Sequence, residues 1–130
     1  MKLFFILTLC FFIQRSSGQV IHTCTTAANE DCSINAGTLK IPDAYFSSGF
    51  SDLKIITFNN DLTEIGEQAF KSTQLATVAF PTTLKKIGIM AFQSITSLTS
   101  ITLNEGLEEI GDDAFSYTRL ITKLLLLTMV

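Results

Sequence analysis

A nine-residue motif that occurs three times is the feature that most constrains the fold of this chain. Its copies run from Leu62 to Phe70, from Leu84 to Phe92 and from Leu107 to Phe115, and all three fit the pattern Leu-x-x-Ile-Gly-x-x-Ala-Phe. Successive copies begin 22 and 23 residues apart. A fixed period of this length predicts a solenoid, in which stacked units share one continuous core.

A short apolar segment with its own spacing predicts the strands of this solenoid. At the ends of residues 53–58, 75–80 and 98–103, large apolar side chains alternate with a small threonine or alanine. This period of two predicts a short strand with Ile56, Phe58 and their equivalents facing inward. One strand per repeat, always in the same direction, would form a parallel sheet along one side. The Ala-Phe pair of the motif is expected on a short helical turn on the other side, and the motif glycine where backbones approach closely or φ is positive.

The first 18 residues have the features of a secretory signal peptide. Lys2 supplies the positive charge, Leu3 to Ile13 form an apolar run, and Ser16 and Gly18 are small residues before the expected cleavage point. The run is too short to span a bilayer. A buried hydrophobic helix is the alternative interpretation. The remaining residues, 19–130, suit one domain.

Net charge argues against two classes of partner. Cleavage removes Lys2 and Arg15, which leaves seven basic and 12 acidic residues and a net charge of −5. Nucleic acids and anionic membranes are bound mainly through basic patches. We therefore expect no nucleic-acid partner and no binding to an anionic membrane surface.

The two cysteines of the mature chain predict a disulfide. Cys24 and Cys32 are eight residues apart in a chain that would enter an oxidising compartment. A metal site or a reactive thiol is the alternative, but His22 is the only other soft ligand nearby and tetrahedral zinc needs four ligands. Residues 20–37 are polar and show no trace of the repeat. We interpret residues 19–38 as a disulfide-stapled N-terminal cap.

Residues 39–130 are interpreted as the repeat domain, with irregular units at both ends. In a degenerate first repeat, Leu39 is placed in the opening slot and Tyr45 and Phe46 in the Ala-Phe slots. At the other end, Lys123 falls where earlier repeats have Val78 and Ile101. Three interpretations remain open for this incomplete C-terminal repeat: a truncated chain, a strand shifted by one residue that pairs with the last repeat, or a membrane tail. The ten residues 121–130 are short for a membrane span, and no transmembrane segment is expected in the mature chain.

The motif followed by Leu-x-x-Ile-x-Leu resembles the BspA-type, or treponemal-type, leucine-rich repeat. The resemblance covers about Leu39 to Leu125. It implies a leucine-rich repeat solenoid of about four repeats of 22–24 residues, with short parallel strands on one face and turns and short helical segments on the other. Many members have a cysteine three residues after the Phe, where this chain has Thr73, Ile95 and Thr118. Members are typically secreted or on the cell surface, and several are implicated in adhesion, which implies a secreted or cell-surface location and a binding role.

Catalysis finds little support in the sequence. His22 is the only histidine and is interpreted as a surface or loop residue. The chain contains no nucleophile elbow, no phosphate-binding glycine loop and no His-Glu-x-x-His motif. We therefore expect a protein that is not an enzyme and has no cofactor.

Charged side chains in the variable positions of the motif suggest contacts between repeats. Lys85 and Lys86 occupy the slots that hold Glu108 and Glu109 one repeat later, so we expect Lys85 near Glu108 and Lys86 near Glu109. Such pairs contribute little stability but help to fix the order of repeats. Four carboxylates lie around Ile110 in the sequence: Glu108, Glu109, Asp112 and Asp113. They could bind calcium, or they could form a solvated edge of the repeat.

The outward positions of the predicted strands are the candidate protein-binding face. They are Lys54, Ile55, Thr57, Ala76, Thr77, Ala79, Thr99, Ser100 and Thr102. This surface is small, rich in threonine and nearly uncharged, although threonine is also an ordinary strand residue. The first hypothesis is a non-catalytic adhesion module that binds a cell-surface or extracellular-matrix protein. The alternative is a truncated fragment without its own binding function, which self-associates through an uncapped C-terminal edge.

Overall fold

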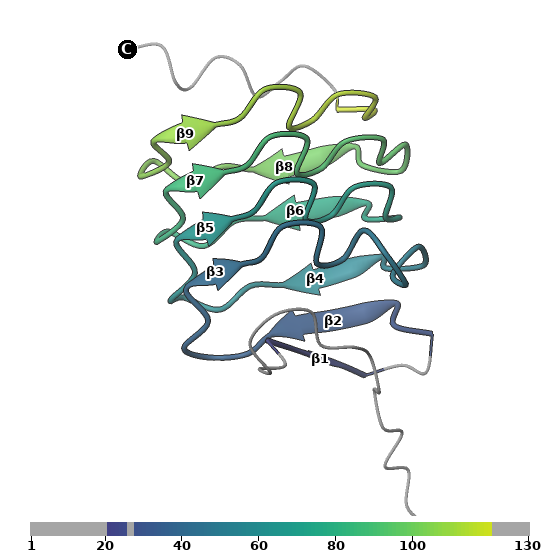
Figure 1. Cartoon of the computed structure of the whole chain (residues 1–130), viewed down its shortest axis with the longest axis horizontal. Helices are drawn as coiled ribbons and strands as arrows, with labels where there is room; N and C mark the ends of the chain where they lie inside the picture. The colour runs from purple at the N-terminus through teal and green to yellow at the C-terminus, as the bar shows by residue number, and fades with distance from the viewer. Residues whose placement is uncertain (1–20, 26–27, 121–130) are drawn as a thin grey trace, which may run out of the picture.

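The computed structural model describes residues 21–25 and 28–120, which form a stack of similar turns (Figure 1). The described residues contain nine short strands and no helix. The predicted signal peptide and the C-terminal residues 121–130, including Lys123, lie outside the described residues.

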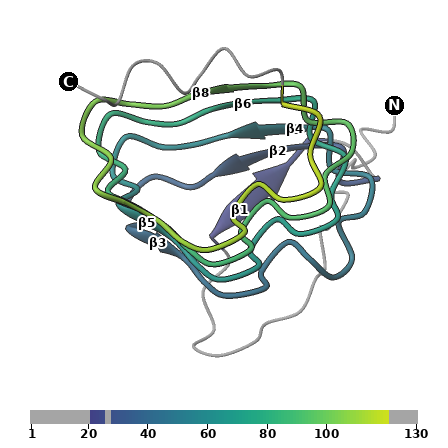
Figure 2. The same ribbon diagram turned by 90° about the horizontal axis from the view of Figure 1, so that it is seen from above.

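Each repeat contributes two strands rather than the one that was predicted. The first set carries the predicted alternation and comprises β2 (Asp31–Ile34), β4 (Ile55–Thr57), β6 (Thr77–Ala79) and β8 (Ser100–Thr102). The second set lies within or next to the motif and comprises β3 (Lys40–Ile41), β5 (Glu64–Ile65), β7 (Lys86–Ile87) and β9 (Glu109–Ile110). The two sets run along opposite sides of the stack (Figure 2).

Parallel pairing of equivalent strands builds the stack. Strands β3, β5, β7 and β9 form one four-stranded parallel sheet, β6 pairs in parallel with β8, and β2 pairs in parallel with β4. Strand β1 (His22–Cys24) is antiparallel to β2 and lies at the N-terminal end. The predicted parallel arrangement is thus confirmed, and the solenoid has a sheet on both sides.

The alternating pattern of the first set places its middle residue in the core. Ile56, Val78 and Ile101 are 7%, 3% and 6% exposed, while the residues on either side of each are exposed. The prediction that these side chains face inward is confirmed. Because the same slot is apolar in each layer, the core is continuous from one repeat to the next.

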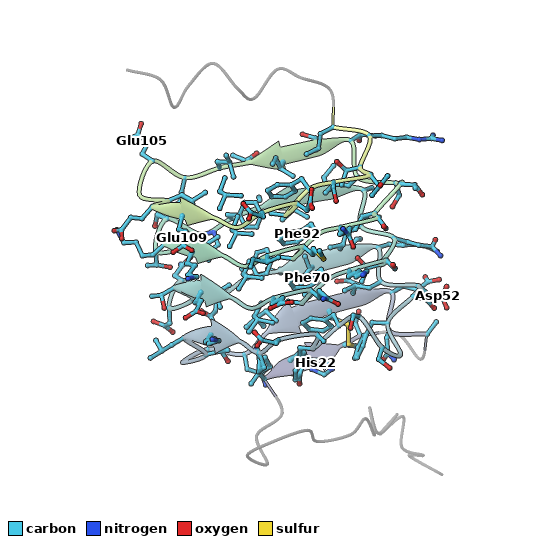
Figure 3. The ribbon with its side chains drawn as sticks, turned by 45° about the horizontal axis from the view of Figure 1, so that its top comes forward. His22, Asp52, Phe70, Phe92, Glu105 and Glu109 are labelled. Atoms are coloured by element: carbon cyan, nitrogen blue, oxygen red, sulfur yellow. A yellow bond between two sulfur atoms is a disulfide. The ribbon has the colours of Figure 1, made fainter. Side chains whose placement is uncertain are left out.

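A column of stacked phenylalanine rings runs through the centre of the core. Phe46, Phe70, Phe92 and Phe115 stack in order, with ring centroids 4.8, 5.0 and 5.3 Å apart and interplanar angles of 11° or less. Figure 3 shows Phe70 and Phe92 one above the other inside the stack. Such aromatic contacts add to the free energy gained by burial alone. The final Phe of each motif therefore stabilises the packing of its repeat against the neighbouring repeat.

The Ala-Phe segment is not helical, which corrects the prediction of short helical segments. The residue before each alanine has a positive φ, 54° at Gln68 and Met90 and 56° at Asp113. A residue in this conformation cannot continue a right-handed helix. The backbone instead bonds across repeats, since the N–H of Gln68 donates to the carbonyl of Ile89 and that of Phe70 to Ala91.

The motif glycines lie where neighbouring backbones meet. A methyl group built on Gly88 would lie 2.6 Å from the carbonyl carbon of Gly66 and 2.7 Å from the amide nitrogen of Glu67. Gly111 meets Gly88 and Ile89 in the same way, and neither glycine has a positive φ. Close approach, one of the two expected reasons for glycine here, is therefore confirmed.

The repeat begins earlier in the chain than the sequence suggested. Cys32 of β2 is in register with Ile56 of β4, so β2 is a repeat strand, and the expectation of no repeat in residues 20–37 was wrong. Lys40 is in register with Glu64, so Thr38 corresponds to Leu62, the first residue of the motif. Thr38 is only 6% exposed, as expected for this inward position. Leu39 had been assigned to that slot, but it is 61% exposed and points to solvent.

Candidate protein-binding face

The outward side chains of β4, β6 and β8 form one exposed surface. Ile55 and Thr57 flank the buried Ile56, and the same pattern holds on β6 and β8. Every residue predicted for this face is exposed: Lys54, Ile55, Thr57, Ala76, Thr77, Ala79, Thr99, Ser100 and Thr102. We refer to these nine residues as the strand face. Its exposure matches the sequence analysis, while a binding role stays a prediction.

The pairing register of β6 and β8 aligns the outward residues of the strand face in columns across the two strands. Thr77 on β6 lies opposite Ser100 on β8, and Ala79 lies opposite Thr102. Outward side chains on neighbouring strands of a sheet are spaced by the strand separation of about 4.8 Å. The face therefore presents small hydroxyl and methyl groups at regular intervals, and no side chain on β6 or β8 projects far from it.

The charges near the strand face lie toward the N-terminal end. The Nζ of Lys54 is 2.9 Å from Oε1 of Glu30, and Asp31 is in register with Ile55. The hydrogen bond to Glu30 raises the pKa of Lys54. The part of the face on β6 and β8 consists of uncharged residues. A ligand that contacts this part would meet hydroxyl and methyl groups rather than charges.

The N-terminal end is closed by a disulfide and an aromatic cluster. Cys24 and Cys32 form the predicted disulfide between β1 and β2. His22 lies in β1 at this end of the stack (Figure 3) and is 5% exposed. Its Nδ1 is 2.9 Å from the hydroxyl of Tyr45, and its ring packs against Phe46 and Phe50. The interpretation of His22 as a surface or loop residue was therefore wrong.

Burial changes the titration of this pair. Desolvation lowers the pKa of His22 below its ordinary value of 6.5, because the charged imidazolium loses water contacts. Desolvation also raises the pKa of Tyr45, partly opposed by a backbone hydrogen bond from Ile21. The sequence analysis missed this contact because His22 lies in β1, outside the motif copies from which contacts between repeats were predicted.

The predicted ion pairs between repeats are present on the opposite side of the stack. Lys85 Nζ lies 2.9 Å from Glu108 Oε1, and Lys86 Nζ lies 3.0 Å from Glu109 Oε1. Lys40 and Glu64 form a further pair at 2.8 Å. Among the described residues, no group of three or more His, Cys, Asp or Glu side chains is placed to hold a metal ion, so the acidic side chains near Ile110 form no cluster there.

These features define a class of protein: a solenoid of short repeats with parallel sheets and an exposed face of small side chains. The sequence profile of the BspA type leucine-rich repeat region matches residues 23–128, in six copies. The chain belongs to this family. The match begins in β1, in agreement with the early start of the repeats in the structure.

One solved structure supports the same assignment. A leucine-rich repeat protein from Bacteroides ovatus ATCC 8483 shares 32% sequence identity, with a TM-score of 0.59. The similarity covers 62% of this chain and 21% of that protein, so this chain matches about a fifth of its length. A search of curated proteins found no significant match. In the part of the chain that the structure describes, no helix has the length and apolar character needed to cross a membrane.

Proposed function

We propose that this protein is a secreted or surface-displayed repeat module that binds a protein ligand through its strand face without catalysing a reaction. The observation that carries this proposal is the exposed, largely uncharged part of the face on β6 and β8. Parallel strands of a solenoid create an extended surface that is suited to a protein partner. Membership of a repeat family that typically supplies binding modules supports the same function.

The predicted signal peptide supports the location. Lys2 and the apolar run from Leu3 to Ile13, as parts of a signal peptide, would direct the chain into the secretory route. The disulfide between Cys24 and Cys32 suits an oxidising compartment. The partner would then be a cell-surface or extracellular-matrix protein, and adhesion would be the resulting activity.

The composition of the strand face sets the expected affinity. It contains no aromatic side chain and no arginine, the residues that carry most binding energy in protein interfaces. A single copy is therefore expected to bind weakly. Display of many copies on one surface would raise the overall affinity without any new contact.

The test compares two arginine substitutions at outward positions. Thr77→Arg and Thr102→Arg each place a long charged side chain on the strand face without entering the core. Thr96→Arg is the matched control, because Thr96 is also exposed but lies outside the face. Binding to immobilised matrix and cell-surface proteins is measured for each variant. The proposal requires that the first two variants lose saturable binding and the control keeps it; equal binding by all three would refute it.

A further inference from the structure

The two sides of the stack differ at one boundary between turns. On the motif side, β3, β5, β7 and β9 form one continuous sheet. On the side of the strand face the sheet is divided, because β4 ends the sheet β1-β2-β4 and β6 pairs only with β8 in a separate sheet of the described chain. Figure 1 shows β4 farther from β6 than β6 is from β8. We refer to the boundary between β4 and β6 as the β4–β6 junction.

Backbone hydrogen bonds that recur at the neighbouring boundaries are missing at the start of this junction. The N–H of Lys54 donates to the carbonyl of Glu30, one turn earlier, at 2.8 Å. The N–H of Thr99 donates in the same way to the carbonyl of Ala76 at 3.0 Å. The equivalent bond at the junction would run from the N–H of Ala76 to the carbonyl of Lys54, and the described backbone has no such bond.

The far end of the junction shows the same difference. Between β6 and β8, the N–H of Phe80 donates to the carbonyl of Thr102 at 3.1 Å. Phe58 holds the equivalent place after β4, and in the described structure its N–H forms no bond with the carbonyl of Ala79. The recurring bonds are therefore missing at both ends of the junction.

The same two turns are firmly bonded to each other on the motif side. Strands β5 and β7 pair in parallel. The N–H of Gly88 donates to the carbonyl of Ile65, and that of Phe70 donates to the carbonyl of Ala91, both at 2.8 Å. Two turns that are bonded along one side and not along the other can bend about the bonded side, as in a hinge.

A pair of aromatic rings lies inside the junction and explains the separation. Phe58 and Phe80 occupy the same inward position of their turns, and their ring centroids are 5.8 Å apart in a stacked arrangement. The equivalent residues of the flanking turns are the smaller Ile34 and Leu103. Paired strands lie about 4.8 Å apart, so the ring stack is wider than a paired junction. Each ring also meets a ring of the central column edge-on, which restricts its movement.

We propose that Phe58 and Phe80 are positioning residues that hold β4 and β6 apart and make the β4–β6 junction a hinge in the strand face. The hinge separates an N-terminal half, with Ile55 and the ion pair of Lys54 and Glu30, from the uncharged half on β6 and β8. A tilt between the halves would let the face follow a curved protein surface. This use in binding rests on the proposed function, whereas the hinge itself does not.

NMR of the full chain, produced through a secretory route, tests the hinge without any ligand. Hydrogen exchange, corrected for intrinsic rates, compares the amide of Ala76 with its equivalents in Lys54 and Thr99. The amide of Ala76 should exchange about tenfold faster or more, because it lacks their bond to the preceding turn. Hinge motions occur on the microsecond-to-millisecond timescale, so relaxation dispersion should appear in β4 and β6 and be absent from β5 and β7.

A double variant tests the role of the two rings. Phe58→Leu/Phe80→Leu gives both positions the residue found at Leu103. It should slow exchange of the Ala76 amide by about tenfold and remove the dispersion. Phe46→Leu is the matched control, because Phe46 belongs to the central column but forms no ring contact with Phe58 or Phe80 in the described structure. Thermal unfolding confirms that each variant is folded, and Phe80→Leu alone replaces the double variant if that one does not fold.

The outcomes separate the hinge from the proposed function. Equal exchange of the Ala76, Lys54 and Thr99 amides, or no dispersion in β4 and β6, would overturn the hinge. Fast exchange that persists in the double variant would overturn the role of the two rings.

Binding to the immobilised matrix and cell-surface proteins is then compared for the parent and the double variant. The double variant should bind about tenfold more weakly to any protein that the parent binds, since its face can no longer tilt. Equal affinity would overturn the role of the hinge in binding. Absence of binding by the parent would refute the proposed function and the use of the hinge in binding, while the NMR result on the hinge itself would stand.

Discussion

Replacement of Gly88 by alanine should destabilise the fold through a single added methyl group. Its Cβ would lie 2.6 Å from the carbonyl carbon of Gly66, whereas ordinary contacts begin at 3.4 Å. The neighbouring atoms belong to the backbone of another repeat, so relief requires the two layers to separate by about 0.8 Å. That movement would stretch the 2.8 Å bond from Gly88 N–H to the Ile65 carbonyl to about 3.6 Å, which is no longer a hydrogen bond.

The expected loss of stability is the sum of two costs and one smaller gain. Overpacking costs about 1–3 kcal/mol, and a weakened interior hydrogen bond costs about 1 kcal/mol more. Alanine also restricts the unfolded chain, which returns about 0.4–1 kcal/mol because Gly88 does not need a positive φ. The steric term is larger, so Gly88→Ala should lower the free energy of unfolding by about 2–3 kcal/mol.

Urea unfolding followed by circular dichroism measures this loss. With a slope of about 1–3 kcal/mol per molar urea, the midpoint should fall by roughly 1 M or more. Gly106→Ala is the control, because its Cβ would lie 3.3 Å from the side-chain amide nitrogen of Asn104 and 3.4 Å from the carbonyl oxygen of Thr82. That variant should stay within about 0.5 kcal/mol of the parent. Equal midpoints for the two variants would refute the close-approach explanation of the motif glycine.

Three further predictions concern the core and the N-terminal end. Phe70→Ala should lower the free energy of unfolding by about 3–5 kcal/mol, since Phe70 is fully buried between two stacked rings; Phe70→Leu should lose less in the same urea assay. Because burial lowers the folded-state pKa of His22, stability should be complete above pH 6.5 and decline as the pH falls below it. The melting temperature measured from pH 8 to pH 5 should show this decline, and the variant His22→Gln should not. An equal decline in the variant would show that protonation of His22 is not its cause. Cys24→Ser/Cys32→Ser should lower the free energy of unfolding by about 2.5 kcal/mol, because the disulfide no longer closes an eight-residue loop in the unfolded chain. Calorimetry that shows no loss of stability would exclude a stabilising role for the disulfide.

The parts of the fold that the sequence predicted are those in which one residue type recurs in one slot. The inward positions of Ile56, Val78 and Ile101 follow from their period of two, because an exposed apolar column would cost free energy in every layer. The ion pair between Lys86 and Glu109 follows from the repeat period alone. The inward positions and the ion pair can both be predicted from the spacing of residues along the sequence, without knowledge of atomic positions.

The parts that were missed depend on contacts between layers. Strands such as Glu64–Ile65 are too short to show any alternation, so only pairing with the next repeat reveals them. The left-handed turns at Gln68 and Met90 contradict the usual preference of these residues, and hydrogen bonds from the neighbouring repeat maintain them. In the first repeat, apolar Leu39 seemed a better match than Thr38, although the register places Thr38 inside.

The sequence predicted that the residues of the candidate site are exposed, but it did not predict the contacts around them. Outward residues such as Thr77 and Thr102 were identified because the face of a strand follows from alternation. Ile110 was placed within an acidic edge, but its exposure of 47% could not be inferred from composition. The buried contact between His22 and Tyr45 arises from folding of β1 over the first repeat, which no local pattern encodes.

Strands β8 and β9 belong to one turn of the stack, and this couples the strand face to the sheet on the opposite side. In a stack of repeats, each turn is stabilised mainly by its neighbours, so the turn that holds β8 and β9 depends on the turn that holds β6 and β7. A ligand that contacts both β6 and β8 on the strand face would hold these two turns together and would also stabilise the pairing of β7 with β9 on the other side. By linkage, a substitution that weakens the pairing of β7 with β9 would also weaken binding of such a ligand to the strand face.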